Sequence, residues 1–502
     1  MWVSQSETLS IAAIAGVGSA AGLALLVGFR QYAHTRTLSD LLPVRRGGRA
    51  RVKTQVEFSS TTVASTISLA TLILAYYELA ATMGLWLLWT VVTTAIGILG
   101  VRVVANRIWE KLRQYGTRIP TLHEFLGTEY QSSTTAFIGA IATSLGYLGA
   151  FAVELTVGSR LFAGLIPHVP TLGVVIVLAM IGLLYTSAGG FRAVVITDRI
   201  QMVAIWVFIA AFTLHYAMTI AHARTSSAVL GNLPQGSLNF SMRPGLIPFL
   251  AGVAVMNIPI YVADMGMWQR VTSTTTPSYT TIGLVKSAAS ASLSWGLLAM
   301  LAILAPAVAR SPEGVNPLLP VLWGLAAPAT WLSVVILFLA IVGLYAAMMS
   351  TASTLLIVVS HTFYEDIIAR WKSASPEERA ESSVSLRWAR GILVLAAIVS
   401  IAIVEILARA GFSIADFVFA IFGAQLGLFP AVYLALSWER SRLRKLSTAA
   451  VWSIGSGFIM GWVSALSGKL LHVDNLVFLA PVVSLTTSSL SLGIGVYCAA
   501  RR

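Results

Sequence analysis

Charged residues and cysteine are both scarce in this sequence. Asp, Glu, Lys and Arg make up 11% of the 502 residues, whereas 57% are hydrophobic. Soluble globular domains carry about 25% charged residues, so this composition indicates a membrane protein with many spans. The single cysteine, Cys498, excludes an internal disulfide and any metal site that needs several thiolates. The seven histidines are scattered without metal-ligand spacing or a nucleophile motif, so we expect no enzyme.

Apolar segments long enough to cross a bilayer follow one another along the chain. One crossing needs roughly 20 apolar residues, which gives about thirteen spans. They lie near residues 9–29, 57–82, 84–106, 133–158, 170–189, 197–220, 245–269, 280–308, 329–360, 387–408, 413–437, 447–467 and 475–499. Basic residues follow the first segment instead of preceding it, so we expect a retained helix with the N-terminus outside.

Acidic residues are also few, 20 against 33 lysines and arginines, which leaves a net charge of +13. With the N-terminus outside, most of the basic residues fall in loops expected to be cytoplasmic, including 30–56, 107–132 and 361–386. This bias predicts a multi-pass protein of the cell (inner) membrane with its C-terminus in the cytoplasm. It explains the basic balance without a nucleic-acid partner.

Hydroxyl side chains interrupt the apolar run of 331–359. Ser350, Ser353 and Thr354 share one helix face, and Thr351 lies one turn after Ala347. Hydroxyl and carbonyl oxygens are the ligands that a small hard cation prefers. The alternative is that the hydroxyls bond to the preceding carbonyls or join neighbouring helices.

Two other spans have the features of broken helices. The inner half of span 57–82 is crowded with Ser and Thr, and span 245–269 contains Pro259 between Gly252 and Gly266. Secondary transporters bind ions and substrate at broken helices in corresponding positions of two inverted repeats. The two spans are five apart, which suggests repeats over 57–220 and 245–437, with 9–29 and 447–499 peripheral. The residues themselves show no self-similarity between the repeats.

Carboxylates at membrane depth need a partner or a function, because each costs about 2.5–3.5 kcal/mol at the centre of a span. Glu154 and Asp264 are the hardest to place in solvent. Asp198 opens span 197–220, where it could be a helix cap or part of an ion site.

Four separated motifs occur in a characteristic order. They are Pro120–Leu126 (PTLHEFL), Tyr185–Gln201 (YTSAGGFRAVVITDRIQ), Trp268–Arg270 (WQR), and Met349–Thr354 (MSTAST) followed by Tyr364–Asp366 (YED). Together they resemble the motifs of the sodium/solute symporter family, which includes bacterial sodium/proline, sodium/galactose and sodium/sialic acid transporters. Ile196 stands where the family pattern has Trp. The resemblance runs through about residues 40–370 and implies an all-α core of five-plus-five inverted repeats with broken first helices.

The resemblance also implies ion ligands. The family's sodium site corresponds here to Ala64, Ile67, Ala347, Ser350 and Thr351. A second sodium site, found in some members, would use Thr66, Asp198, Ser350, Ser353 and Thr354. The family's proline transporters carry Asp at position 66, so the Thr in this chain argues against proline as the substrate.

Substrate positions implied by the resemblance are Thr66, Ser68, Thr71, Glu154 and Asp264. Glu154 and Asp264 fall where the sugar transporter has Asn. Two carboxylates in place of two amides favour a cationic or amine-bearing substrate, or a carboxylate that replaces a coupling ion. A neutral solute remains the alternative.

We therefore predict a secondary active transporter that couples uptake of a small polar organic solute to Na+ by alternating access. The expected partners are the solute, sodium and the lipid bilayer. The alternatives are a symporter-fold sensor that signals through a separate partner, and a neutral-solute permease for urea or a sugar-like compound.

Overall fold

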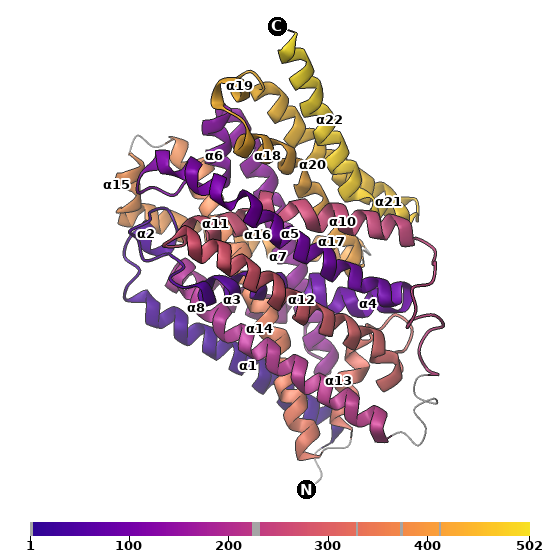
Figure 1. Ribbon diagram of the computed structural model, residues 1–502. Coiled ribbons are helices and arrows are strands. Elements are labelled where there is room, and N and C mark those ends of the chain that lie inside the picture. The colour runs from indigo at the N-terminus through magenta and orange to yellow at the C-terminus, as the bar shows by residue number, and fades with distance from the viewer. Residues whose placement is uncertain (1–3, 223–230, 328–329, 372–374, 411–412, 502) are drawn as a thin grey trace.

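The computed structural model describes residues 4–222, 231–327, 330–371, 375–410 and 413–501. Parts of the predicted loops 221–244 and 361–386, residue 329 at the start of the predicted span 329–360, and residues 411–412 between the spans 387–408 and 413–437 lie outside the described residues. Within the described ranges the chain forms helices and no β-sheet (Figure 1).

The first part of the chain runs through α1 (Gln5–Tyr32), α2 (Leu38–Leu41), α3 (Gln55–Thr66), η1 (Leu69–Leu74), α4 (Ala75–Met83), η2 (Gly84–Leu87), α5 (Leu88–Leu112), η3 (Arg113–Tyr115), α6 (Leu122–Glu129), α7 (Ser133–Leu165) and α8 (Thr171–His222). The middle part contains α10 (Leu246–Ala263), α11 (Met265–Ser273), α12 (Pro277–Val308), α13 (Leu318–Ala326), α14 (Trp331–Thr362), η4 (Phe363–Ile368) and η5 (Ala369–Trp371). The last part contains α15 (Pro376–Ala380), α16 (Ser383–Ala410), α17 (Ile414–Gln425), η6 (Leu426–Leu428), α18 (Phe429–Ser437), α19 (Arg440–Arg444), α20 (Ser447–Leu470), α21 (Asp474–Phe478) and α22 (Ala480–Ala500).

Eleven helical runs in the described part of the chain are long and apolar enough to cross a membrane. The predicted number was about thirteen. Two of the runs, Leu69–Tyr115 and Thr171–Ala221, have 47 and 51 residues. At about 1.5 Å per residue each exceeds twice the roughly 30 Å of a bilayer core, so each can supply two crossings. The chain is thus an integral multi-pass membrane protein, and the all-helical fold class predicted from the sequence is confirmed.

A glycine allows the sharp bend that divides α8. Gly190 has φ 61°, and a Cβ atom at this position would lie 2.5 Å from the backbone oxygen of Leu41. Only glycine meets both conditions without strain. The bend separates the two halves of α8 and brings Asp198, two turns later, against α3 and α14.

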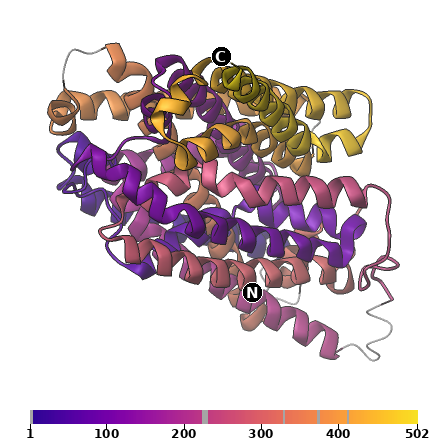
Figure 2. The same ribbon diagram turned by 45° about the horizontal axis from the view of Figure 1, so that its top comes forward.

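α14 lies at the centre of the bundle. It packs against α8 and α7, and α1 covers α8 and α14 on one flank. On the other side α20 packs against α22, and these last helices form a separate layer at the edge of the molecule (Figure 2).

Two helices are interrupted near the middle of the bundle, as predicted for spans 57–82 and 245–269. In the first, α3 ends at Thr66, and the hydroxyls of Ser65 and Thr66 donate to carbonyls of the preceding turn. Such bonds compete with helix continuation. The extended residue Ser68 then caps η1 by accepting the Thr71 amide at 2.8 Å.

In the second, α10 contains Pro259, which cannot donate a backbone hydrogen bond. The chain leaves the helix at Asp264 (φ −81°, ψ 123°), and α11 starts at the next residue.

Candidate functional site

The predicted ligands of the first sodium site lie where α3 breaks and where α14 passes beside it. Ala64, Ile67, Ala347 and Ser350 are fully buried, and Thr351 is 8% exposed. α3 and α14 pack directly against each other. The structure therefore brings both halves of this predicted site to the same interface.

Thr351 carries an unpaired hydroxyl group at this interface. Its Oγ1 atom is buried and has no hydrogen-bond partner among the described residues. Most buried hydroxyls in folded proteins are paired, so an unpaired one needs an explanation such as an ion or a water. Its hydroxyl oxygen, together with backbone carbonyls at a helix break, suits a sodium ion.

Asp198 does not act as a helix cap. Its carboxylate is fully buried and accepts hydrogen bonds from Ser350 Oγ at 2.7 Å and from Thr61 Oγ1. These donors come from α14 and α3, so Asp198 ties three helices together. Thr61 is not among the predicted ligands, because one hydroxyl in a span rich in Ser and Thr has no distinguishing signal.

A guanidinium group lies beside this cluster. Arg270 on α11 is 4% exposed and donates to Thr354 Oγ1 at 2.9 Å and to Thr61 Oγ1 at 3.3 Å. Its positive charge acts on both Asp198 and Asp264. Arg270 belongs to the WQR motif, but the sequence could not show which groups it would contact.

The other members of the predicted second sodium site each take part in a hydrogen bond. Ser353 Oγ donates to the backbone oxygen of Ser350 at 3.0 Å, and Thr66 Oγ1 donates to that of Val63 at 2.8 Å. Thr354 is used by Arg270. The structure thus brings Asp198 and Ser350 together, whereas Thr354 accepts a hydrogen bond from Arg270.

Glu154 and Ser68, both predicted to bind substrate, are bonded to each other instead. Ser68 Oγ donates to Oε1 of Glu154, and the Ala70 amide donates to Oε2 at 3.5 Å. Glu154 is 0% and Ser68 2% exposed, and neither lines the central cavity. A carboxylate of α7 thus accepts hydrogen bonds from residues at the start of η1.

Asp264 accepts a hydrogen bond at the start of α11 in a similar way, but it also lines the central cavity. Its Oδ1 accepts the Met267 amide, and its Oδ2 accepts the hydroxyl of Tyr147. A Cβ atom at Gly266 would lie 3.2 Å from both Asp264 Oδ1 and Arg270 Nη1, so a glycine here leaves these groups room to approach.

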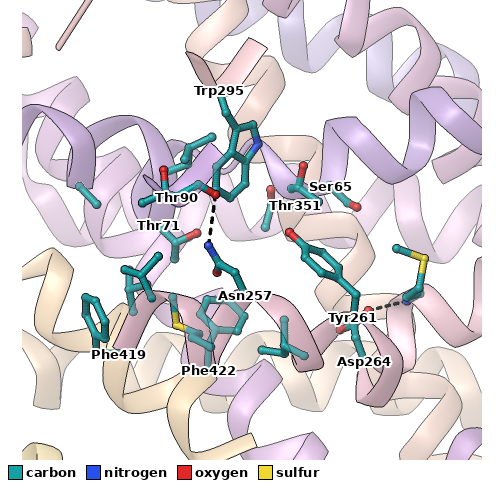
Figure 3. A pocket seen from close by; sticks show the side chains of 18 of the residues that line it. Ser65, Thr71, Thr90, Asn257, Tyr261, Asp264, Trp295, Thr351, Phe419 and Phe422 are labelled. Carbon is teal, nitrogen blue, oxygen red and sulfur yellow. Dashed lines mark hydrogen bonds between the residues drawn. The ribbon is translucent and has the colours of Figure 1, made fainter. Parts of the chain in front are cut away.

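The central cavity lies between the two breaks, and its walls are mainly apolar and aromatic. The aromatic side chains include Tyr76, Phe249, Tyr261, Trp295, Phe419 and Phe422. Polar side chains of the lining include Thr66, Thr71, Asp264, Arg270, Thr351 and Thr354. Figure 3 shows Asp264 next to Tyr261, with Trp295 and the two phenylalanines of α17 around the open space. Three of the predicted substrate residues, Thr66, Thr71 and Asp264, therefore line this cavity.

An amide adds a further polar group that the motifs do not mark. Asn257 Nδ2 donates to Thr93 Oγ1 at 3.1 Å and to Thr94 Oγ1 at 3.2 Å. These bonds hold its side chain against α5, so that its position in the cavity wall is fixed.

Histidines and carboxylates form no metal cluster in the described part of the chain. His123, in α6 between two spans, is fully buried. Burial lowers its pKa to about 3, so the ring is neutral at physiological pH.

Comparison with solved structures shows the fold that this site belongs to. The chain is similar to a Na+-coupled sialic acid symporter in a substrate-bound outward-open state, at 16% identity and a TM-score of 0.73 over 98% of each chain. It is also similar to Mhp1, a nucleobase-cation-symport-1 family transporter in a closed conformation with bromovinylhydantoin bound (13% identity, TM-score 0.55, 92% of this chain and 95% of that one). A manganese transporter mutant from Eremococcus coleocola matches at 13% identity and a TM-score of 0.51 over 88% of this chain and 95% of that one.

No protein-family model and no curated protein matched the sequence. The structural likeness shows that the chain has the inverted-repeat fold of secondary transporters.

Proposed function

We propose that the protein is a sodium-coupled symporter of a small organic cation, with an amine near Asp264 and an apolar body in the aromatic part of the cavity. In this proposal residues 57–220 and 245–437 are the two repeats, the N-terminus is outside and the C-terminus is in the cytoplasm. The observation that carries it is the unpaired buried hydroxyl of Thr351, at the junction of the broken helix α3 with α14.

Sodium coupling is supported by the donor set at that junction. Backbone oxygens of Ala64, Ile67 and Ala347 and the hydroxyls of Ser350 and Thr351 are hard oxygen ligands without a thiolate or imidazole among them. A bound sodium ion would supply the positive charge that joins α3 to α14. The sialic acid symporter, which has the same fold, is named as Na+-coupled, and this agrees with the assignment.

The charges around the two breaks favour one sodium ion and a cationic substrate. Asp198 and Asp264 are carboxylates near the guanidinium of Arg270, and Glu154 is a further buried carboxyl group at the first break. Bound cations would offset the excess of carboxylates over Arg270, and unbalanced charge at membrane depth is costly. Arg270 takes the role that a second sodium ion would have beside Asp198.

Both helix breaks also argue against an anionic substrate. Half-helix N-termini in secondary transporters point at anionic substrate groups. Here Asp264 caps α11 and Glu154 accepts from Ser68 beside η1, so the chain's own carboxylates hold these positions. A cationic group is attracted to the same place, and the faces of Tyr261 and Trp295 can add cation–π interactions.

The mechanism that follows is alternating access. Sodium would fix α3 against α14 and favour the form that binds substrate, which is a shift of population by a ligand. The cation would then bind between Asp264 and the aromatic walls before the cavity opens to the other side. At a potential of about 100 mV each charge contributes ~2.3 kcal/mol, so two charges support roughly a thousandfold accumulation.

Three compounds that share a phenyl group on a short chain but differ in charge test the substrate class. Phenethylamine, 2-phenylethanol and phenylacetate are compared by thermal shift of the purified full chain in NaCl and in KCl. We expect stabilisation by the amine in sodium, weaker stabilisation in potassium, and none by phenylacetate. Equal stabilisation by 2-phenylethanol would indicate that the substrate is a neutral solute and not a cation.

Transport is tested in proteoliposomes with the quaternary analogue of phenethylamine, which does not cross a bilayer unaided. We expect a sodium-dependent inward current with a Hill coefficient for sodium near one. Sodium-dependent binding without uptake would indicate the sensor function instead.

A further inference from the structure

A second cavity lies away from the central one, between the α18–α20 connection and the end of α22. It is lined by Trp438, Ser441, Arg442 and Lys445 on one side and by Val496 and Ala499 on the other. α19 and the C-terminal end of α22 lie together at the top of Figure 1. The cavity thus combines two cations with an apolar helix wall.

The basic residues around α19 divide into two sets. Arg440 faces inward, where Nη2 lies 2.9 Å from Oε1 of the buried Glu129, which Lys111 also contacts. Arg442 and Lys445 face the cavity, are exposed, and form no ion pair within the described residues. Their charges are therefore available to a ligand.

The position of the cavity is at a membrane boundary. α22 is one of the candidate spans, and its last two residues, Ala499 and Ala500, line the cavity. Only 17% of its most apolar window is buried within the chain, so most of this helix faces outward. Trp438 is half-buried at the same level, as is typical of aromatic residues at the headgroup region.

The wall formed by α22 is held in place by a close helix contact. A Cβ atom at Gly495 would lie 2.2 Å from the Cβ of Ala449, so glycine lets α22 approach the start of α20. The distance between Val496 and the basic residues of the connection is therefore set by packing.

We propose that this cavity binds the phosphate headgroup of an anionic phospholipid. The Arg442 guanidinium and the Lys445 ammonium would hold the phosphate oxygens, and Ser441 can donate a further hydrogen bond. Val496 and Ala499 would contact the start of an acyl chain. Basic pockets between spans at the cytoplasmic side are suited to such headgroups. The site is independent of the transported substrate and of sodium.

Native mass spectrometry and thermal shift of the full chain in detergent test this site with phosphatidylglycerol, phosphatidylcholine and inorganic phosphate. We expect phosphatidylglycerol to bind and stabilise the chain, and the other two to do so weakly. In Arg442→Gln/Lys445→Gln its affinity should fall about thirtyfold, since each basic residue contributes about 1 kcal/mol. The control is Arg444→Gln/Arg36→Gln, which removes the same charge outside the cavity.

Equal loss in the control would show general electrostatic attraction and overturn the site. Unchanged affinity in the Arg442→Gln/Lys445→Gln variant, or equal binding of phosphatidylcholine, would do the same. Stabilisation by inorganic phosphate as strong as by the lipid would identify a soluble phosphate site and also reject the lipid.

Discussion

The two helix breaks use carboxylates in different ways. At the first break the carboxylate comes from another helix, because Glu154 of α7 reaches Ser68, and the pair is sealed from the cavity. At the second break Asp264 caps its own helix and lines the cavity. The two acidic residues at the helix breaks therefore differ in accessibility. The comparison indicates that Glu154 is structural, whereas Asp264 is the carboxylate that would meet the substrate in the proposed function.

The largest expected effect is that of Asp264→Asn. Asn is as good a helix cap as Asp, so α11 should stay folded while the negative charge is lost. Hydrogen bonds to charged groups contribute about 1.5–3 kcal/mol, so kcat/KM for the organic cation should fall about ten- to a hundredfold. This kcat/KM is measured from uptake in proteoliposomes, and circular dichroism is the control for folding. Unchanged uptake would remove Asp264 from the substrate site and end the distinction between the two breaks.

A smaller effect is expected for Thr351→Ala, which tests whether the first break binds sodium. Removing one oxygen ligand should raise the sodium concentration for half-maximal uptake about tenfold, which corresponds to about 1.4 kcal/mol. The matched control is Ser353→Ala on the same helix, because that hydroxyl donates to the Ser350 carbonyl. An equal shift in both variants, or none in Thr351→Ala, would contradict the sodium assignment.

The spans and both breaks could be predicted from the sequence because they depend on local properties. Apolar length, Pro259 and the run of hydroxyls before Ser68 act within one segment. The partners of Glu154 and Arg270 could not be predicted, because they depend on how α7 and α11 are rotated against other helices. Thr61 has no signal of its own, since it becomes special only when Asp198 is packed against it. The site residues that were missed are thus those defined by tertiary contacts.

Glu154→Gln should change stability and leave substrate affinity nearly intact. The two oxygens of Glu154 accept from Ser68 and Ala70, so an amide NH2 in place of either oxygen leaves one of these donors without its acceptor. An unsatisfied buried group costs about 1–3 kcal/mol, so the thermal midpoint should fall while KM stays within about twofold. Midpoints in detergent and KM values in proteoliposomes check this pair of outcomes. A large rise in KM with an unchanged midpoint would make Glu154 a substrate residue like Asp264.

The smallest effect is expected for Ser68→Ala, which sharpens the comparison at the first break. The variant removes the cap of η1, for which about 1 kcal/mol is typical, and one donor to Glu154. Because both effects involve Glu154, the double variant Ser68→Ala/Glu154→Gln should lose less stability than the two single variants together, with a coupling of about 0.5–3 kcal/mol. Thermal midpoints of the four proteins give this coupling. Additive losses would mean that Ser68 and Glu154 act separately, and the first break would then be held by the backbone of η1 and not by a carboxylate from α7.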